Sequence, residues 1–400
     1  MTQKIVIAGS GFAGLWAAIS AARAVSLAGK ENDVDIVVVS PAPSVTIRPR
    51  LYEAVLENMD PDISTLLEAV GVRYAAGWVE TIDVDRKQIV YRARAGARTT
   101  LPYDRLVLAA GSSVFLPKVP ELDRHAFNVD SLAAAQALDA HLKSLPARPP
   151  SAARNTVVVA GAGLTGLETA TEMPPRLRAL LGGEARVVLV DTAAEVGMGI
   201  GPHAAPAIRE ALAEVGVDTR AGVRVDAIDA DGVTLSDGER IPTHTLIWTA
   251  GMRASPLTEQ VPGERDPQGR VVGDAYLRAP SARGIFLTGD TVKAATDDQG
   301  NYNVMSCQHA MSLGRVAGHN AAAELVGLPL HPYSQPKYVT CLDLGAWGAL
   351  YTEGWERLVR FTRQEGKKIK QEINTVWIYP PKPDRDAVFA IANPDYVIVP

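Results

Sequence analysis

The residues of this 400-residue chain best suited to chemistry lie in two glycine-rich turns. The turns are 9-GSGFAG-14 and 161-GAGLTG-166, and their glycines are Gly9, Gly11, Gly14, Gly161, Gly163 and Gly166. In this spacing the first glycine allows a tight turn, the second admits backbone N–H groups to a pyrophosphate, and the third lets the next helix pack on the strand. Each turn follows a Val/Ile run and opens an apolar helical segment. The sequence therefore predicts two dinucleotide sites.

An acidic residue that ends the second strand normally bonds a ribose hydroxyl of the dinucleotide. In the second copy Asp191 ends 186-RVVLVD-191 and no basic residue follows directly, which favours NADH over NADPH. Asp191 lies further from Gly161 than the usual ~20 residues. Pro174 and Pro175 fall in this interval, so we expect the helix to kink or end near Met173. In the first copy Ser40 takes the strand-ending position, where its hydroxyl is a weaker ribose ligand.

The elements that position these turns repeat along the chain. Buried strands are expected at 34–40, 103–112, 186–191 and 245–252, with further strands at 78–91 and 217–238. Apolar runs that alternate with helices predict parallel strands buried on both faces. The late run 283-RGIFLTGD-290 is expected to return to the first sheet.

The predicted fold class is therefore α/β, with two Rossmann-like dinucleotide-binding domains and a smaller C-terminal region. The first domain is discontinuous, because the second is inserted into it. We expect the first domain at residues 1–118 and 270–325, the second at 119–269 and the C-terminal region at 326–400.

Composition excludes several functional classes. A net charge of −5 argues against nucleic-acid binding, and the seven histidines show no metal-ligand spacing. Only Cys307 and Cys341 occur, which indicates a reducing compartment rather than a disulfide framework. No leader peptide or run of about 18 apolar residues is evident. We expect a cytoplasmic protein, with attachment to the inner face of a membrane left open.

Three strand-ending motifs extend the pattern: 108-LAAGS-112, 248-WTAGM-252 and 285-IFLTGD-290, which contribute Gly111, Gly251 and Gly289. With the two turns they resemble the two-dinucleotide-binding-domain flavoproteins. The resemblance implies FAD in the first domain, with its pyrophosphate on the first turn and its ribityl chain on Asp290. It implies NAD(H) in the second domain, with Glu168 near the nicotinamide.

Subfamily features concern the flavin surroundings. The disulfide reductases of this fold carry a Cys-x4-Cys pair, which 45-VTIRPRLYEAVLE-57 lacks, so their thiol chemistry is excluded. Arg48 in this stretch resembles an arginine that contacts FAD in ferredoxin reductases. The segment 306-SCQHAMSLG-314 resembles a helix of type II NADH dehydrogenases, in which Gln308 would lie near flavin and quinone. Ser312 replaces the second glutamine of that helix, His309 is a weak candidate for proton delivery, and both cysteines are expected to be buried thiols.

The stretch from Glu356 to Lys370 carries six basic and two acidic residues beside apolar positions. Such a basic amphipathic segment suits a membrane surface. The alternative is a C-terminal module packed on the flavin domain with its charged face in water. Gly366 and Pro380-Pro381 interrupt the helical pattern, so we favour the packed module.

These features predict an FAD-dependent NADH oxidoreductase similar to type II NADH dehydrogenases. NADH would pass a hydride to flavin N5, and a quinone-like or other small acceptor would reoxidise the flavin. Gln308 and Glu168 are the expected catalytic residues, and no metal is required. Two alternatives stay open: a ferredoxin-reductase-like electron carrier, and an NADH-responsive sensor without rapid turnover. A homodimer is compatible with all three.

Overall fold

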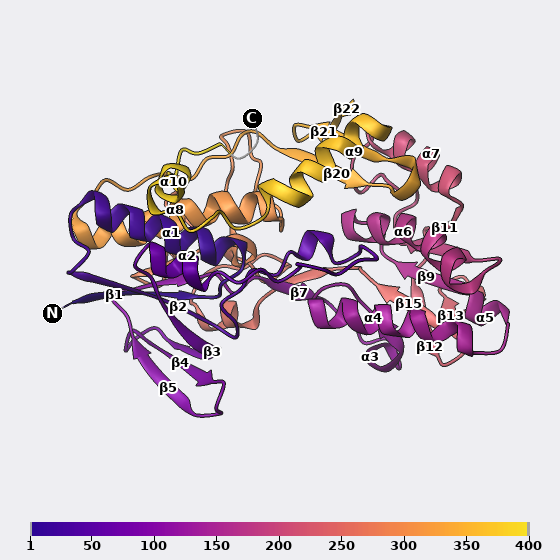
Figure 1. Ribbon diagram of the computed structural model, residues 1–400, viewed down its shortest axis with the longest axis horizontal. Coiled ribbons are helices and arrows are strands. Elements are labelled where there is room, and N and C mark those ends of the chain that lie inside the picture. Colours follow the sequence, from indigo (N-terminus) through magenta and orange to yellow (C-terminus); the bar gives the residue numbers. More distant parts are fainter. Residues whose placement is uncertain (1, 398–400) are drawn as a thin grey trace.

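A computed structural model describes residues 2–397 and contains two large sheets side by side (Figure 1). The seven-stranded sheet has the order β18-β6-β1-β2-β3-β4-β5, and the five-stranded sheet has the order β11-β10-β9-β15-β8. Neighbouring strands from β18 to β3, and all those of the second sheet, run parallel. Val, Ile and Leu dominate the central strands and are buried, as expected for a parallel sheet that is covered on both faces.

The first half brings together distant parts of the chain. Strand β18, which follows the second half in sequence, pairs with β6 of the first sheet. The elements of this half are β1 (Gln3–Ala8), α1 (Phe12–Leu27), β2 (Val34–Ser40), α2 (Ser64–Ala69), β3 (Arg73–Asp83), β4 (Gln88–Ala93), β5 (Arg98–Pro102), β6 (Arg105–Leu108), β17 (Val271–Val272), β18 (Ile285–Leu287), β19 (Val292–Lys293) and α8 (Cys307–Val326). The first domain is thus discontinuous, as the sequence predicts.

The second half repeats the strand–turn–helix order of the first. Its elements are α3 (Leu122–His125), β8 (Ala126–Phe127), α4 (Leu132–Ser144), α5 (Ala152–Asn155), β9 (Thr156–Ala160), α6 (Leu164–Leu181), β10 (Arg186–Asp191), α7 (Ala205–Val215), β11 (Val217–Ala221), β12 (Val225–Asp229), β13 (Gly232–Leu235), β14 (Arg240–Pro242) and β15 (Thr245–Trp248). The chain passes between the two halves twice. The two strands at these passages, β7 (Ser112–Val114) and β16 (Met252–Ala254), form an antiparallel pair.

Helix α6 differs from the expectation at its two prolines. It does not end near Met173 but continues through Pro174 and Pro175 to Leu181. Pro175 leaves the carbonyl of Thr171 without its usual helical donor. The backbone of Gly345 covers that carbonyl, since a methyl carbon on Gly345 would lie 2.4 Å from it. Packing of the C-terminal region therefore tolerates the prolines that the sequence suggested would stop the helix.

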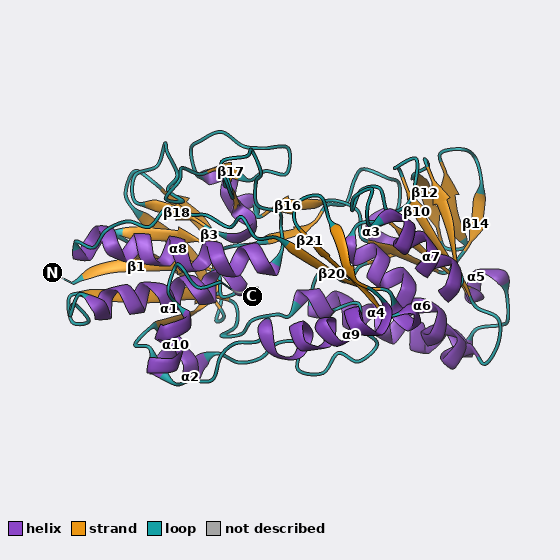
Figure 2. Cartoon of the chain, turned by 90° about the horizontal axis from the view of Figure 1, so that it is seen from above, coloured by secondary structure: helices purple, strands orange, loops and turns teal. Residues whose placement is uncertain are grey.

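The sheet and the first helix of the C-terminal region lie between the two halves, and its last helix lies beside α1 (Figure 2). It consists of the antiparallel sheet β20 (Val339–Asp343), β21 (Ala349–Glu353) and β22 (Leu358–Phe361), with α9 (Arg363–Glu372) and α10 (Arg385–Ile391). Its cations are divided between water and protein. Arg363 is exposed and pairs with Glu210 and Glu214 of α7, and Lys368 is exposed. Lys367 and Lys370 of α9 instead pair with Asp343 and Glu168.

Close packing of α1 on α8 supports the first sheet. A methyl carbon on Gly318 would lie 2.1 Å from the carbonyl oxygen of Ala17, and one on Gly314 would lie 2.5 Å from that of Ala13. These glycines are four residues apart on one face of α8, so the two helix backbones touch along that face. The contact holds the start of α8 beside the first glycine turn.

We predict that Gly318→Ala lowers stability by about 1–3 kcal/mol, because the methyl group forces the helices apart. The thermal midpoint of the holoprotein is the measurement. Gly183→Ala is the matched control, since nothing lies within 4 Å of a methyl carbon there. Equal midpoints for the two variants would contradict the proposed α1–α8 contact.

Candidate functional site

The first glycine turn forms a cradle at the carboxyl end of β1. Gly9 has a left-handed φ of 114°, and a methyl carbon there would lie 2.4 Å from the carbonyl oxygen of Ala109. A methyl carbon on Gly14 would lie 2.0 Å from the carbonyl oxygen of Gly9, whereas nothing lies within 4 Å of one on Gly11. Gly9 and Gly14 therefore serve backbone packing, and the middle glycine, Gly11, leaves open space at the N-terminus of α1. This geometry fits a dinucleotide pyrophosphate.

The second turn repeats this arrangement beside Asp191. A methyl carbon on Gly166 would lie 1.8 Å from the carbonyl oxygen of Gly161, and Gly163 again faces open space. Asp191 accepts hydrogen bonds from the backbone N–H of Ala162 at 2.5 Å and of Ala193 at 2.8 Å. Its carboxylate is thus fixed against the turn despite the long interval in sequence. In the first half, Ser40 instead donates its hydroxyl to the carbonyl of Ala42 at 2.6 Å.

Asp290 and Arg48 belong to one buried polar group. The Ser112 hydroxyl donates to the Asp290 carboxylate at 2.5 Å, and Arg48 lies 4.0 Å from it. Arg48 also donates to the carbonyl of Ser112 at 3.1 Å and pairs with Asp130. Burial raises the pKa of the Asp290 carboxyl, which the Ser112 hydroxyl and Arg48 oppose. Gly111 and Gly289, with φ of 66° and 64°, make the turns that bring these strands' ends together.

The start of α8 carries Cys307, Gln308 and His309. Ser306 caps the helix by accepting from the backbone N–H of His309 at 3.3 Å. Both polar atoms of the Gln308 amide are buried and have no partner among the described residues, which fits a missing flavin or acceptor partner. His309 is fully buried, and burial lowers its pKa to about 3, so it stays neutral. Burial also raises the pKa of the free Cys307 thiol to about 11.

Glu168 lies in a buried charged network that joins the three parts of the molecule. Its carboxylate accepts from Lys370 of α9 at 2.7 Å and from the backbone N–H of Asp343 at 3.1 Å. Asp343 in turn pairs with Lys367 at 2.6 Å and accepts from the Tyr52 hydroxyl at 3.2 Å. Burial raises the pKa of the Glu168 carboxyl and Lys370 opposes the rise. The carboxylate is therefore turned toward the C-terminal sheet.

Sequence reasoning missed Lys370, Asp343, Ser112 and Asp130. In sequence Lys370 is one cation of an amphipathic segment. Ser112 ends the motif 108-LAAGS-112 but carries no sign of its partner Asp290, and Asp130 and Asp343 belong to no recognisable motif. Arg48 and Asp130, like Glu168 and Lys370, are far apart in sequence. No local signal predicts such pairs, because the folded sheets bring them together.

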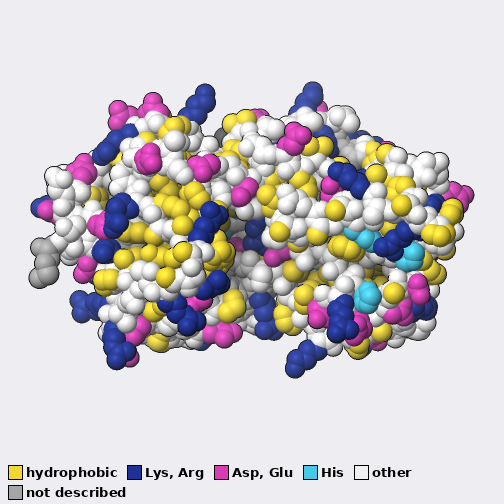
Figure 3. All heavy atoms as spheres, turned by 60° about the horizontal axis from the view of Figure 1, so that its bottom comes forward, with side chains coloured by type: hydrophobic (Ala, Val, Ile, Leu, Met, Phe, Trp, Pro, Cys, Tyr) yellow, Lys and Arg dark blue, Asp and Glu magenta, His cyan; other side chains and the backbone are white. Residues whose placement is uncertain are grey.

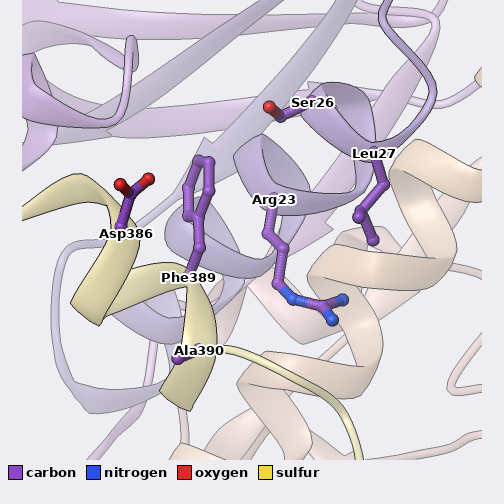
Figure 4. Close-up of a pocket in the computed structure, with 6 residues that line it drawn as sticks. All are labelled: Arg23, Ser26, Leu27, Asp386, Phe389 and Ala390. Carbon is purple, nitrogen blue, oxygen red and sulfur yellow. The ribbon is translucent and has the colours of Figure 1, made fainter.

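The surface has a groove between the two halves and a separate hollow away from the glycine turns. Figure 3 shows a groove between the two halves on the side of the β4–β5 hairpin. A shallow hollow of about 280 Å³ lies elsewhere, between α1 and α10, where Arg23, Leu27 and Phe389 line it (Figure 4). Arg23 and Leu27 belong to the C-terminal part of α1, the end opposite the glycine turn. This hollow is therefore not part of the dinucleotide site.

Comparison with family models and known proteins agrees with this geometry. Residues 3–314 match the model described as pyridine nucleotide-disulphide oxidoreductase. An NADH dehydrogenase-like protein of Mycobacterium tuberculosis is 46% identical over 383 residues, which cover 94% of each chain. The demethylphylloquinone reductase NdbB of a Synechocystis strain is 28% identical over 356 residues, covering 87% of this chain and 86% of its own.

A solved structure of NDH2 from Plasmodium falciparum in complex with NADH shares the fold. It has a TM-score of 0.75 at 14% identity and covers 98% of this chain and 97% of its own. Within the described residues, no helix has the length and apolar character needed to cross a membrane. The chain belongs to the pyridine nucleotide-disulphide oxidoreductase family, as an NAD(P)H oxidoreductase that binds FAD and NADH.

Proposed function

We propose that this protein is an NADH:acceptor oxidoreductase that reduces a small, water-soluble quinone. The observation that carries the proposal is the orphaned Gln308 amide, both of whose polar atoms are buried at the start of α8. When bound, FAD accepts a hydride from nicotinamide C4 at its N5 atom and passes two electrons to the acceptor. The relatives' names, which include type II NADH:quinone oxidoreductases of M. tuberculosis, support the quinone class.

The residues that hold the two dinucleotides follow from the turns. Gly11 leaves room for the FAD pyrophosphate at the N-terminus of α1, while Asp290 and Arg48 would meet the ribityl chain and the flavin. Asp290 is held in place by Ser112. Gly163 and Asp191 would hold NADH in the second half, where the fixed carboxylate accepts from a ribose hydroxyl and repels a 2′-phosphate. Holding the two dinucleotides requires positioning and electrostatics, and neither of the two sites needs a nucleophile.

Lys370 and Gln308 are the polar side chains best placed for the acceptor. Lys370 lies close enough to α8 for its charge to oppose the rise in pKa of the Cys307 thiol. The ammonium is held by Glu168 and by the carbonyl of Cys341 at 3.1 Å. A cation and an amide at this end of α8 would orient an acceptor carbonyl and stabilise the negative charge that builds on it during reduction.

The direct test reduces the holoprotein with NADH without oxygen and then mixes it with quinones, a ferredoxin or dyes. We predict that Gln308→Ala slows reoxidation by a short-tailed quinone by about tenfold or more and leaves reduction by NADH within about threefold. Stopped-flow absorbance of the flavin measures both half-reactions. Gln364→Ala, at an exposed glutamine of α9, is the control. Slowing of the NADH half-reaction alone would place the acceptor elsewhere, and reoxidation by ferredoxin only would make the protein an electron carrier.

Asp191 should set the preference for NADH. We predict that kcat/KM for NADH exceeds that for NADPH by tenfold to several-hundredfold, because a carboxylate beside a 2′-phosphate costs a few kcal/mol. In Asp191→Ser the gap should narrow by about tenfold, mainly through faster use of NADPH. Steady-state rates with both nucleotides measure it, with Asp218→Ser on β11 as the control. Equal rates with both nucleotides in the unmodified protein would refute the assignment.

The Glu168–Lys370 pair should behave as a buried ion pair. We predict that Lys370→Met destabilises the holoprotein by about 3–5 kcal/mol, because the Glu168 carboxylate is left buried without its cation. The double variant Glu168→Gln with Lys370→Met should recover part of this loss. Thermal midpoints of the four proteins complete the cycle, and strict additivity of the two changes would contradict a direct pair.

A further inference from the structure

A group of hydrogen-bond donors lies between the start of α8 and the turn that joins β21 to β22. We name it the donor cluster: His309, Trp355 and Arg357, arranged around the ring of Tyr338. The Trp355 ring stacks on Tyr338 with centroids 4.6 Å apart, and the His309 ring lies 5.1 Å from Tyr338. The Arg357 guanidinium lies 4.7 Å from the centre of the Tyr338 ring. Four side chains from three segments therefore form one packed group.

Each member of the donor cluster has a buried polar atom without a protein partner. Among the described residues, no acceptor meets Nε2 of His309, Nε1 of Trp355 or Nη1 of Arg357. The His309 side chain is fully buried. Trp and Arg nitrogens only donate, so what they lack is an acceptor. Folded proteins leave few such groups unpaired, because each costs about 1–3 kcal/mol. Three in one group indicate a ligand rich in acceptor oxygens.

The charge of the donor cluster limits the class of ligand that fits it. Arg357 has no carboxylate within ion-pair distance among the described residues. Of the other cations of this segment, Arg360, Arg363, Lys367 and Lys370 are paired, and Lys368 is exposed to water. Its neighbour Glu356 points instead toward His203, 3.9 Å away. His309 is neutral and adds no charge. The donor cluster thus carries one uncompensated positive charge in a partly dry setting, which favours an anionic ligand.

The position of Arg357 is fixed by the backbone around it. Its φ of 56° is left-handed, an uncommon conformation for a residue with a long side chain. The loop of the NAD(H)-binding half packs on it, since a methyl carbon on Gly201 would lie 3.1 Å from Cγ of Arg357. His309 directly follows Gln308, so the donor cluster and the amide that we assign to the acceptor share the first turn of α8.

We propose that the donor cluster binds the ionised oxygen of an anionic acceptor, a quinone-sized ring that carries a carboxylate, sulfonate or phenolate. This rests on the proposed function and names the chemical class of its acceptor. The Arg357 guanidinium and the Trp355 N–H pair with the anion, and the His309 ring supplies a third contact. In the reaction NADH donates a hydride and solvent a proton, so the quinone leaves as the quinol and NAD⁺ is released.

Binding to the oxidised holoprotein, without turnover, tests the proposal. The probes are naphthalene-2-sulfonate and naphthalene-2-sulfonamide, which have the same ring and differ in charge. We expect the sulfonate to bind about tenfold or more tightly than the sulfonamide, measured by titration calorimetry. In Arg357→Gln the sulfonate should lose that advantage, while sulfonamide affinity stays within about threefold. Trp355→Phe, which removes the N–H and keeps a ring, should weaken the sulfonate selectively.

The matched control is Arg360→Gln, an exposed arginine of β22 that is paired with Glu353 at 2.8 Å. It removes the same charge from the same hairpin and should leave the preference for sulfonate intact. Equal loss in Arg360→Gln and Arg357→Gln would mean a diffuse charge effect and would overturn the site. A wild-type protein that does not distinguish the two probes would overturn it as well. Flavin content verifies that each variant is folded.

Turnover separates this proposal from the proposed function. With NADH, we expect Arg357→Gln to lower kcat/KM for 1,2-naphthoquinone-4-sulfonate about tenfold and for 1,2-naphthoquinone less than about threefold. If no quinone reoxidises the flavin but the sulfonate preference persists and depends on Arg357, the proposed function fails and the anion site stands. If Arg357→Gln raises only the KM for NADH, the anion is a phosphate of the nucleotide, and the acceptor assignment is wrong.

Discussion

The contact between the third glycine of each turn and the carbonyl of the first positions the helix at each candidate dinucleotide site. Gly14 touches Gly9, and Gly166 touches Gly161, so closely that neither pair has room for a methyl group. Each contact sets the N-terminus of a helix directly at the carboxyl end of a central strand. The positive end of the helix dipole then faces the space left by the middle glycine. Because the same contact occurs twice, the chain presents two phosphate cradles on two sheets.

Two cradles alone do not make an electron-transfer site, because the halves must also be held in register. The antiparallel pair β7–β16 starts after Gly111 and Gly251, so the link begins at the strand ends where the ligands lie. Buried charges complete the connection. Lys370 of the C-terminal region donates to Glu168 of the second half. Asp343 of the same region accepts a hydrogen bond from the Tyr52 hydroxyl of the first half. Such pairs contribute little net stability, but they demand one geometry. That requirement suits a site in which small displacements are costly to catalysis.

Local patterns predicted the periodic part of this molecule well. The strand at 186–191 has the predicted bounds, and the run that ends in Asp290 joins the first sheet as expected. The failures lie where distant segments meet. Pro174 and Pro175 were expected to kink or end α6 near Met173. The helix does not end there but continues to Leu181, and Gly345, far away in sequence, packs on the carbonyl of Thr171 that Pro175 leaves without a helical donor. Lys370 looked like a surface cation because nothing near it in sequence indicates Glu168. Helix or strand propensity and hydrophobic periodicity describe one element at a time, whereas the positions of these residues depend on contacts between two elements.

The C-terminal segment shows why composition alone misleads about surfaces. An interfacial helix must present apolar side chains and cations to the same lipid surface. Between Glu356 and Lys370 three of the cations instead pair with carboxylates of the protein: Arg363 with Glu210 of α7, Lys367 with Asp343 and Lys370 with Glu168. Arg360 and Lys368 are exposed. The apolar side chains of β22, Leu358, Val359 and Phe361, are exposed on a strand rather than on the helix. Part of the basic composition that suggested a lipid surface therefore binds the C-terminal region to α7 and to Glu168 of the second half.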